Sequence, residues 1–62
     1  MSGVVPDKGD LVWGLVPPIR GEGYPGPEVL GVVYAIISEG IWVEYPGGVL
    51  CLFRLLDLES AD

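Results

Sequence analysis

Four aromatic residues and one carboxylate are the side chains of this sequence whose types and spacing suggest chemistry. Trp13, Tyr34, Trp42 and Tyr45 fall in stretches that are predicted to be neighbouring β-strands, and Glu44 lies among them. Aromatic rings beside a carboxylate can bind a methylated ammonium group through cation–π attraction. Aromatic residues also dominate protein cores and protein–protein interfaces. Core or interface packing is therefore the main hypothesis for these residues, and an aromatic pocket is the alternative.

The residue types that are absent exclude several kinds of active site. The chain has no His and a single Cys, Cys51. Without His, neither a Ser/His/acid nor a Cys/His relay can form, and a zinc site of Cys and His ligands cannot be built. The acidic residues follow no spacing typical of a cation-binding loop. We therefore expect no enzymatic activity, no catalytic residue, no cofactor, no metal and no small-molecule substrate.

The charge pattern argues against nucleic acid and membranes as partners. The formal net charge is −6, and the only cations, Lys8, Arg20 and Arg54, are dispersed along the chain. Phosphate binding requires clustered cations. The longest stretch without a charge, residues 29–38, is too short for a membrane helix, which needs about twenty residues. No basic stretch precedes an apolar one at the start of the chain, so we expect no signal peptide.

Length and hydrophobicity together predict a protein partner. The 62 residues form one domain, 1–62, with a barrel over about 8–59 and flexible termini, and half of the residues are apolar. A chain this short buries only about 60% of the surface that its unfolded form exposes. One small core cannot hide so many apolar side chains, and the remainder is expected to face another protein chain or a second copy.

The strand and turn pattern predicts the fold. Residues 10–16, 29–37, 41–45, 49–53 and 58–59 are the predicted strands. Residues 17–28 contain four Pro and three Gly and predict a long ordered loop. Residues 38–40 and 46–48 are predicted turns, residues 54–57 are a link that can form one 3₁₀ turn, and no helix of ordinary length fits. The layout is that of an all-β, small five-stranded SH3-like barrel with a long Pro/Gly-rich first loop.

Alternation along the strands leaves apolar side chains on both sheet faces. Residues 41, 43 and 45 share one face, as do 49, 51 and 53, and Gly31, Val33 and Ala35 are expected to oppose Leu30, Val32, Tyr34 and Ile36. An antiparallel sheet normally has one wet face, so the second apolar face predicts a partner. Which face is inside stays open. The residues expected to contact the partner are Trp13, Ile19, Tyr24, Tyr34, Trp42, Leu50 and Leu52.

Segments along almost the whole chain carry a resemblance to known proteins. Residues 8–12 (KGDLV), 31–33 (GVV), 42–48 (WVEYPGG) and 56–59 (LDLE) follow in that order. The chain resembles the short SH3-like barrel proteins encoded in bacteriophage genomes. That resemblance implies a virion or accessory component located in the virion or the host cytoplasm. Residues 9–13 (GDLVW) also resemble the opening of PWWP domains, which are Tudor-like readers.

Together these observations predict a non-enzymatic structural or adaptor protein that acts by protein–protein interaction. It would be a phage virion or accessory component, or a small barrel that assembles with itself. The alternative is a reader of peptides or methylated side chains, of Tudor or PWWP type, that uses the aromatic pocket. The loop of residues 17–28 would serve either as a contact for a partner's aromatic groove or as a rigid connector.

Overall fold

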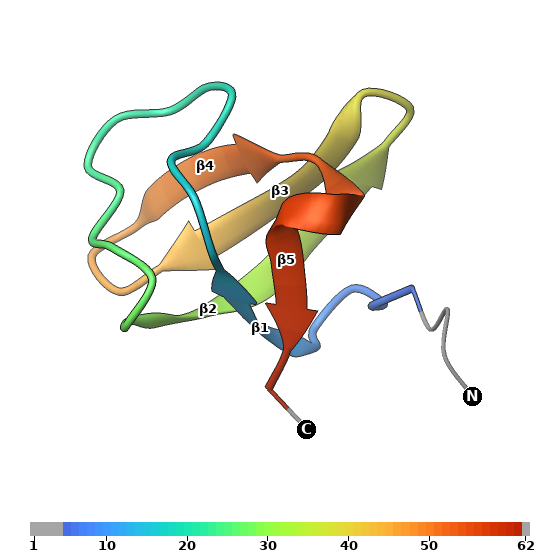
Figure 1. The fold of residues 1–62 in the computed structure, drawn as a ribbon, viewed down its shortest axis with the longest axis horizontal. Coiled ribbons are helices and arrows are strands. Elements are labelled where there is room, and N and C mark those ends of the chain that lie inside the picture. Colours follow the sequence, from blue (N-terminus) through green and yellow to red (C-terminus); the bar gives the residue numbers. More distant parts are fainter. Residues whose placement is uncertain (1–4, 62) are drawn as a thin grey trace.

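The computed structural model describes residues 5–61, which form one antiparallel sheet (Figure 1). The strands are β1 (Leu11–Gly14), β2 (Leu30–Ile37), β3 (Gly40–Tyr45), β4 (Val49–Phe53) and β5 (Leu58–Ser60), and a 3₁₀ helix, η1 (Leu55–Asp57), lies between β4 and β5. The strand order across the sheet is β4-β3-β2-β1-β5. The prediction of an all-β chain with five strands is confirmed, and so is the 3₁₀ turn before the last strand.

The first strand is shorter than predicted. Residues 10–16 were expected to be extended, but β1 ends at Gly14. The backbone N–H of Leu15 donates to the carbonyl of Asp57 at 2.9 Å, so the chain leaves β2 at this point and turns toward η1. Leu15 and Val16 favour strands by residue type and are nevertheless exposed. The pairing of β1 with β2 and β5 ends at Gly14, and β-propensity without a neighbouring strand does not extend a strand. The other four strands match their predicted bounds to within one residue.

The β3–β4 hairpin follows the turn chemistry of its sequence. The N–H of Gly48 donates to the carbonyl of Tyr45 at 3.2 Å, and Gly47 adopts a φ of 93°. A positive φ at the third turn position is the requirement of a type II turn, and Pro46 suits the second position. The turn sets the register, in which Tyr45 pairs with Val49.

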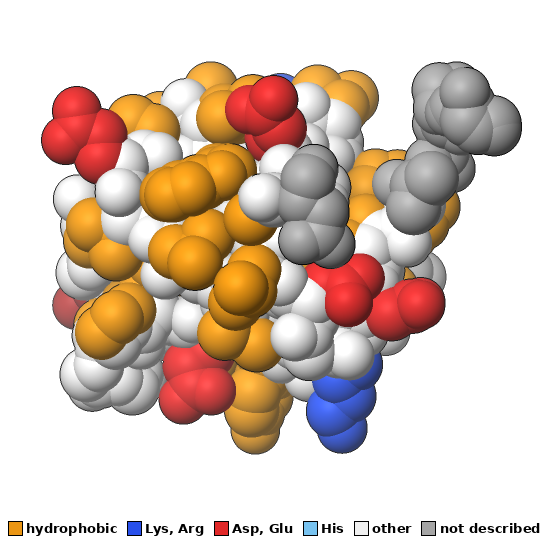
Figure 2. Space-filling view, turned by 90° about the horizontal axis from the view of Figure 1, so that it is seen from below, with side chains coloured by type: hydrophobic (Ala, Val, Ile, Leu, Met, Phe, Trp, Pro, Cys, Tyr) orange, Lys and Arg blue, Asp and Glu red, His pale blue; other side chains and the backbone are white. Residues whose placement is uncertain are grey.

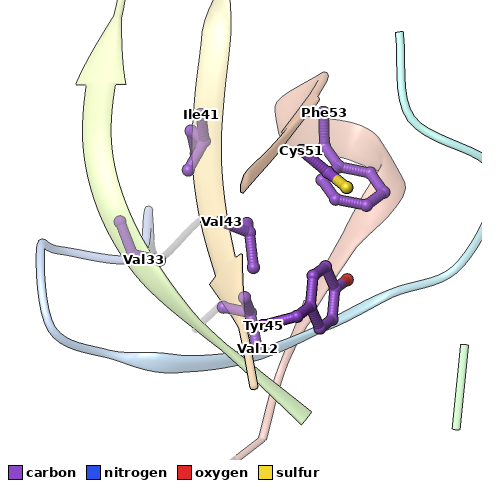
Figure 3. Packing of buried hydrophobic residues seen from close by; sticks show 7 residues of the cluster. All are labelled: Val12, Val33, Ile41, Val43, Tyr45, Cys51 and Phe53. Atoms are coloured by element: carbon purple, nitrogen blue, oxygen red, sulfur yellow. The ribbon is translucent and has the colours of Figure 1, made fainter. Parts of the chain in front are cut away.

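One face of the sheet forms the core. The buried cluster points its side chains toward one another (Figure 3) and consists of Val12, Val33, Ile41, Val43, Tyr45, Cys51 and Phe53. Gly31 permits the close approach of β2, because a Cβ there would collide with Val43 and lie 3.0 Å from Tyr45 Cε1. A glycine inside a strand is typical of such a close approach. The inner face is thus the one that carries alternate residues 41, 43 and 45.

A bulge in β2 changes the expected alternation. Val33 pairs with Val43, but Ala35 pairs with Trp42, so Tyr34 is an extra residue opposite β3. Paired residues project from the same face of a sheet. Ala35 therefore lies on the face of Trp42, and the prediction that it shares a face with Gly31 and Val33 is wrong. Strict alternation fails wherever one strand carries an additional residue.

The connection from β1 to β2, residues 15–29, runs beside β4 (Figure 1, cyan to green). Ile19 N–H donates to the carbonyl of Leu52 at 2.7 Å, and Leu52 N–H donates to the carbonyl of Arg20 at 2.9 Å. The backbone at Gly21 lies so close to β4 that a Cβ on this residue would lie 2.5 Å from the carbonyl oxygen of Leu50. An unpaired strand edge is a site of unwanted pairing with other chains. This connection occupies part of the edge that β4 would otherwise expose.

Candidate protein-binding groove

Two of the seven predicted partner contacts are used inside the chain. Leu52 is only 2% exposed, so its side chain is covered by the chain itself. The ring of Tyr24 lies edge-on to Phe53, with centroids 5.7 Å apart, and its hydroxyl donates to the carbonyl of Gly14 at 2.6 Å. Tyr24 thus anchors the β1–β2 connection to the core. A partner would reach Leu52 only by displacing part of the fold.

The remaining five predicted contacts are spread over the surface. Trp13, Trp42 and Leu50 are half-buried, whereas Ile19 and Tyr34 are exposed. Register places Trp13 opposite Leu30 and Glu59, and it places Trp42 opposite Leu52 and Ala35. Ile19 lies in the β1–β2 connection and Tyr34 lies at the bulge.

The aromatic pocket of the alternative hypothesis is not assembled around its four proposed residues. Tyr45 is 2% exposed, and its ring contacts those of Tyr24 and Phe53 at centroid distances of 6.1 and 6.4 Å. Trp42 alternates with Val43 and Tyr45 along β3 and projects from the opposite face. The reader hypothesis stays a prediction, and it would require a pocket built without Tyr45.

The outer face of the sheet carries an apolar groove of about 490 Å³, which we call the outer groove. It is lined by Leu11, Leu30, Val32, Glu44, Tyr45, Pro46, Gly47 and Gly48. Register sets Leu11 opposite Val32, and Val32 opposite Glu44, so their side chains lie side by side across three strands. Leu11 and Val32 are 44% and 38% exposed. Figure 2, which views the molecule from below relative to Figure 1, shows hydrophobic side chains gathered on this face with acidic side chains around them.

The residues that line the outer groove were not among the predicted contacts. Alternation places Leu30 and Val32 on the face opposite Gly31 and Val33, and Leu11 on the face of Trp13, but it leaves open which face is the core. The prediction favoured aromatic residues, which are enriched at binding hot spots. The signal that would have found the groove is the pairing of β1 with β2, which the sequence pattern does not specify.

Among the described residues 5–61, Glu44 is the only charged residue that lines the outer groove. Its cross-strand neighbours on the same face are Val32 in β2 and Leu50 in β4. Within residues 5–61, Glu44 has no ionic or hydrogen-bonding partner for its side chain, and the ion pair of that part of the chain, Arg54 Nε to Asp57 Oδ2 at 3.1 Å, lies elsewhere. The outer groove is therefore an apolar surface with one unpaired carboxylate.

A smaller hollow lies at the other end of β2. It has a volume of about 250 Å³, and Val5, Ile36, Ile37 and Leu55 provide apolar side chains, with Glu39 and Arg54 as charges of opposite sign. Arg54 is already paired with Asp57.

Cys51 lies in the core, and burial raises the pKa of its thiol. Among residues 5–61, no three side chains of the metal-ligating types gather into a site for a metal ion. No helix in the same range is long and apolar enough to cross a membrane.

The thiol of Cys51 is expected to react with an aromatic disulfide reagent at least about a hundredfold more slowly in the folded protein than in denaturant. Reaction requires the thiolate and an opening of the core that exposes it. The rate is followed by the absorbance of the released aromatic thiolate. Equal rates in the two conditions would show that Cys51 is accessible in the folded state.

No family model, no characterised protein and no solved structure gives a significant match to this chain.

Proposed function

We propose that this chain is a small SH3-like barrel that acts as a non-enzymatic structural or adaptor protein by binding another protein chain or a second copy of itself. Three features support the barrel: the strand order β4-β3-β2-β1-β5, the long β1–β2 connection, and η1 between β4 and β5. The setting we propose is a phage virion or the host cytoplasm, which rests on the sequence resemblance over residues 8–59.

The observation that carries the functional proposal is the group of partly exposed aliphatic side chains that line the outer groove, Leu11, Leu30 and Val32. Full burial of an aliphatic side chain contributes roughly 1.5–3 kcal/mol. Leu11 and Val32 are already more than half covered and Leu30 is half-buried, so covering what remains exposed offers about 1–3 kcal/mol before the costs of association are subtracted. A partner that covers the outer groove would remove from water the apolar side chains that the core cannot accommodate.

The substitution Val32→Glu is expected to abolish binding at the outer groove, because it adds a second carboxylate beside Glu44 and among the aliphatic side chains of the groove. The measurement is the enrichment of clones from a displayed library of random heptapeptides on the immobilised protein. We expect enrichment on the wild-type protein to exceed that on Val32→Glu by about tenfold or more.

The matched control is Leu56→Glu, which also replaces an aliphatic side chain by a carboxylate, at a residue that is 74% exposed and lies outside the outer groove. This variant is expected to enrich the same peptides as the wild-type protein. Equal losses in the two variants would show that added negative charge, and not the outer groove, governs binding.

Light scattering after size exclusion separates the two kinds of occupant. A discrete dimer that is lost in Val32→Glu and kept in Leu56→Glu would assign the outer groove to a second copy. A mass of 6.6 kDa at every concentration would leave a foreign chain as the occupant.

A further inference from the structure

Glu44 determines what kind of partner the outer groove can accept. The side chains of Leu11, Val32, Glu44 and Leu50 form one row across four strands, and only Glu44 is charged. While the outer groove is open, water solvates this carboxylate. A purely apolar partner that covered the row would strip that water and leave a buried charge without a partner, which costs several kcal/mol. The row thus disfavours partners that bring no cation or hydrogen-bond donor for the Glu44 carboxylate.

Charge complementarity identifies the compensating group. No Lys or Arg lines the outer groove, and the chain carries a net charge of −6. A cation brought by the partner would form a charge-assisted hydrogen bond with Glu44, and the negative field of the whole chain would favour its approach. The geometry points to a segment of a different protein chain that is apolar and carries one Lys or Arg placed against Glu44. This inference rests on the proposed binding function of the outer groove.

A second copy fits the outer groove poorly. A two-fold arrangement of outer groove on outer groove would bring two Glu44 carboxylates toward one another, because such interfaces use the same patch on both subunits. The chain has only three cations. Arg54 is paired with Asp57, and neither Lys8 nor Arg20 lines the outer groove. The proposed occupant is therefore a foreign segment and not a two-fold copy that packs outer groove on outer groove.

The size of the row limits the length of that segment. Four adjacent strands span about 14 Å, which corresponds to roughly four residues of extended chain. A heptapeptide is long enough to cover the row and leave both ends in water. Displayed random heptapeptides are therefore a suitable probe.

The test compares the peptides selected by the wild-type protein with those selected by Glu44→Gln. Gln keeps the size of the side chain and removes the charge. We expect wild-type selections to be enriched in Lys or Arg at one position flanked by apolar residues. This cation preference should fall by about tenfold or more in Glu44→Gln, because the unpaired charge no longer has to be compensated. Glu22→Gln, an exposed residue of the β1–β2 connection, is the matched control and should keep the preference.

The outcomes separate the inference from the function on which it rests. Apolar peptides without a cation preference, or the same preference in Glu44→Gln, would overturn the inference while the binding function stands, provided that Val32→Glu still abolishes enrichment. Enrichment that persists in Val32→Glu, or no enrichment on any variant, would overturn both. Circular dichroism of each variant confirms that the fold is kept before selection.

Discussion

Replacement of Gly14 by Ala is expected to lower the free energy of unfolding by about 2–3 kcal/mol. Gly14 lies where β1 crosses the core, and a Cβ there would approach Phe53 Cζ and the Tyr45 hydroxyl to 2.6 Å each. These are ring and hydroxyl atoms of buried side chains, which have little freedom to move. Overpacking of this kind forces side chains off their rotamers or shifts the backbone.

The opposing effect of the substitution is smaller. Ala restricts the unfolded chain more than Gly does, which stabilises a protein by about 0.4–1 kcal/mol where the backbone conformation suits Ala. Gly14 is not among the glycines with positive φ, so this gain applies in full. The collision nevertheless exceeds it. A domain of this length has a total stability of roughly 3–9 kcal/mol. The melting temperature should therefore fall by about 8–24 °C, measured by thermal and urea unfolding monitored through tryptophan fluorescence.

Two further variants isolate the collision. Gly47→Ala meets no heavy atom within 4 Å but has a φ of 93°, so it should lose only about 1 kcal/mol through backbone strain. Phe53→Leu removes the ring atoms nearest Gly14. In a double-mutant cycle, Gly14→Ala should be less destabilising in the Phe53→Leu background than in the wild-type protein. A loss for Gly14→Ala no larger than that for Gly47→Ala, with no coupling to Phe53, would contradict this account.

The elements predicted from the sequence are those that depend on local chemistry. The hairpin at residues 46–48 needs only a Pro and a Gly with positive φ, and β4 occupies its predicted residues. The close approach at Gly31 is likewise the usual role of a glycine inside a strand. For each of these, the residues within a few positions decide the outcome.

The elements that the sequence did not predict depend on contacts between distant residues. The end of β1 is determined by the hydrogen bond from Leu15 to Asp57, which lies far along the chain. The role of Tyr24 is determined by Gly14, Tyr45 and Phe53, and hydrophobicity alone suggested a partner contact instead. The outer groove forms where β1 and β2, paired in this register, meet the β3–β4 hairpin. Periodicity predicts which residues share a face of one strand, but not which strands meet.

Wild-type stability is expected to fall steeply above about pH 10, and Tyr45→Phe should remove a large part of that fall. Burial, with smaller contributions from the neighbouring Tyr24 and Cys51, raises the pKa of Tyr45 from its ordinary value of 10.0 to about 12, although the nearby polar backbone of Gly14, which does not meet hydrogen-bond geometry with the hydroxyl, lowers it in part. The folded protein therefore keeps a proton that the unfolded chain releases. The stabilising effect is complete below pH 10 and is lost as the pH rises toward 12, at about 1.4 kcal/mol per pH unit.

Two neighbours of Tyr45 also contribute to the loss of stability at alkaline pH. The pKa of Tyr24 and the pKa of the Cys51 thiol are also raised, in each case chiefly by burial. Their ionisation likewise favours the unfolded chain at alkaline pH. The measurement is urea unfolding at a series of pH values from 7 to 11, where Tyr45 alone should account for about 1–2 kcal/mol of the loss at pH 11.

Tyr45→Phe and Tyr24→Phe distinguish this effect from a general loss of packing. The hydroxyl of Tyr45 is buried without a hydrogen-bond partner among the described residues. Its removal should leave stability at pH 7 unchanged or up to about 1 kcal/mol higher, since an unsatisfied buried polar group is unfavourable. The hydroxyl of Tyr24 donates to the carbonyl of Gly14, so Tyr24→Phe should lose about 1 kcal/mol at pH 7. If Tyr45→Phe lost as much stability as the wild-type protein between pH 7 and pH 11, the ionisation of Tyr45 would not be the cause of alkaline unfolding.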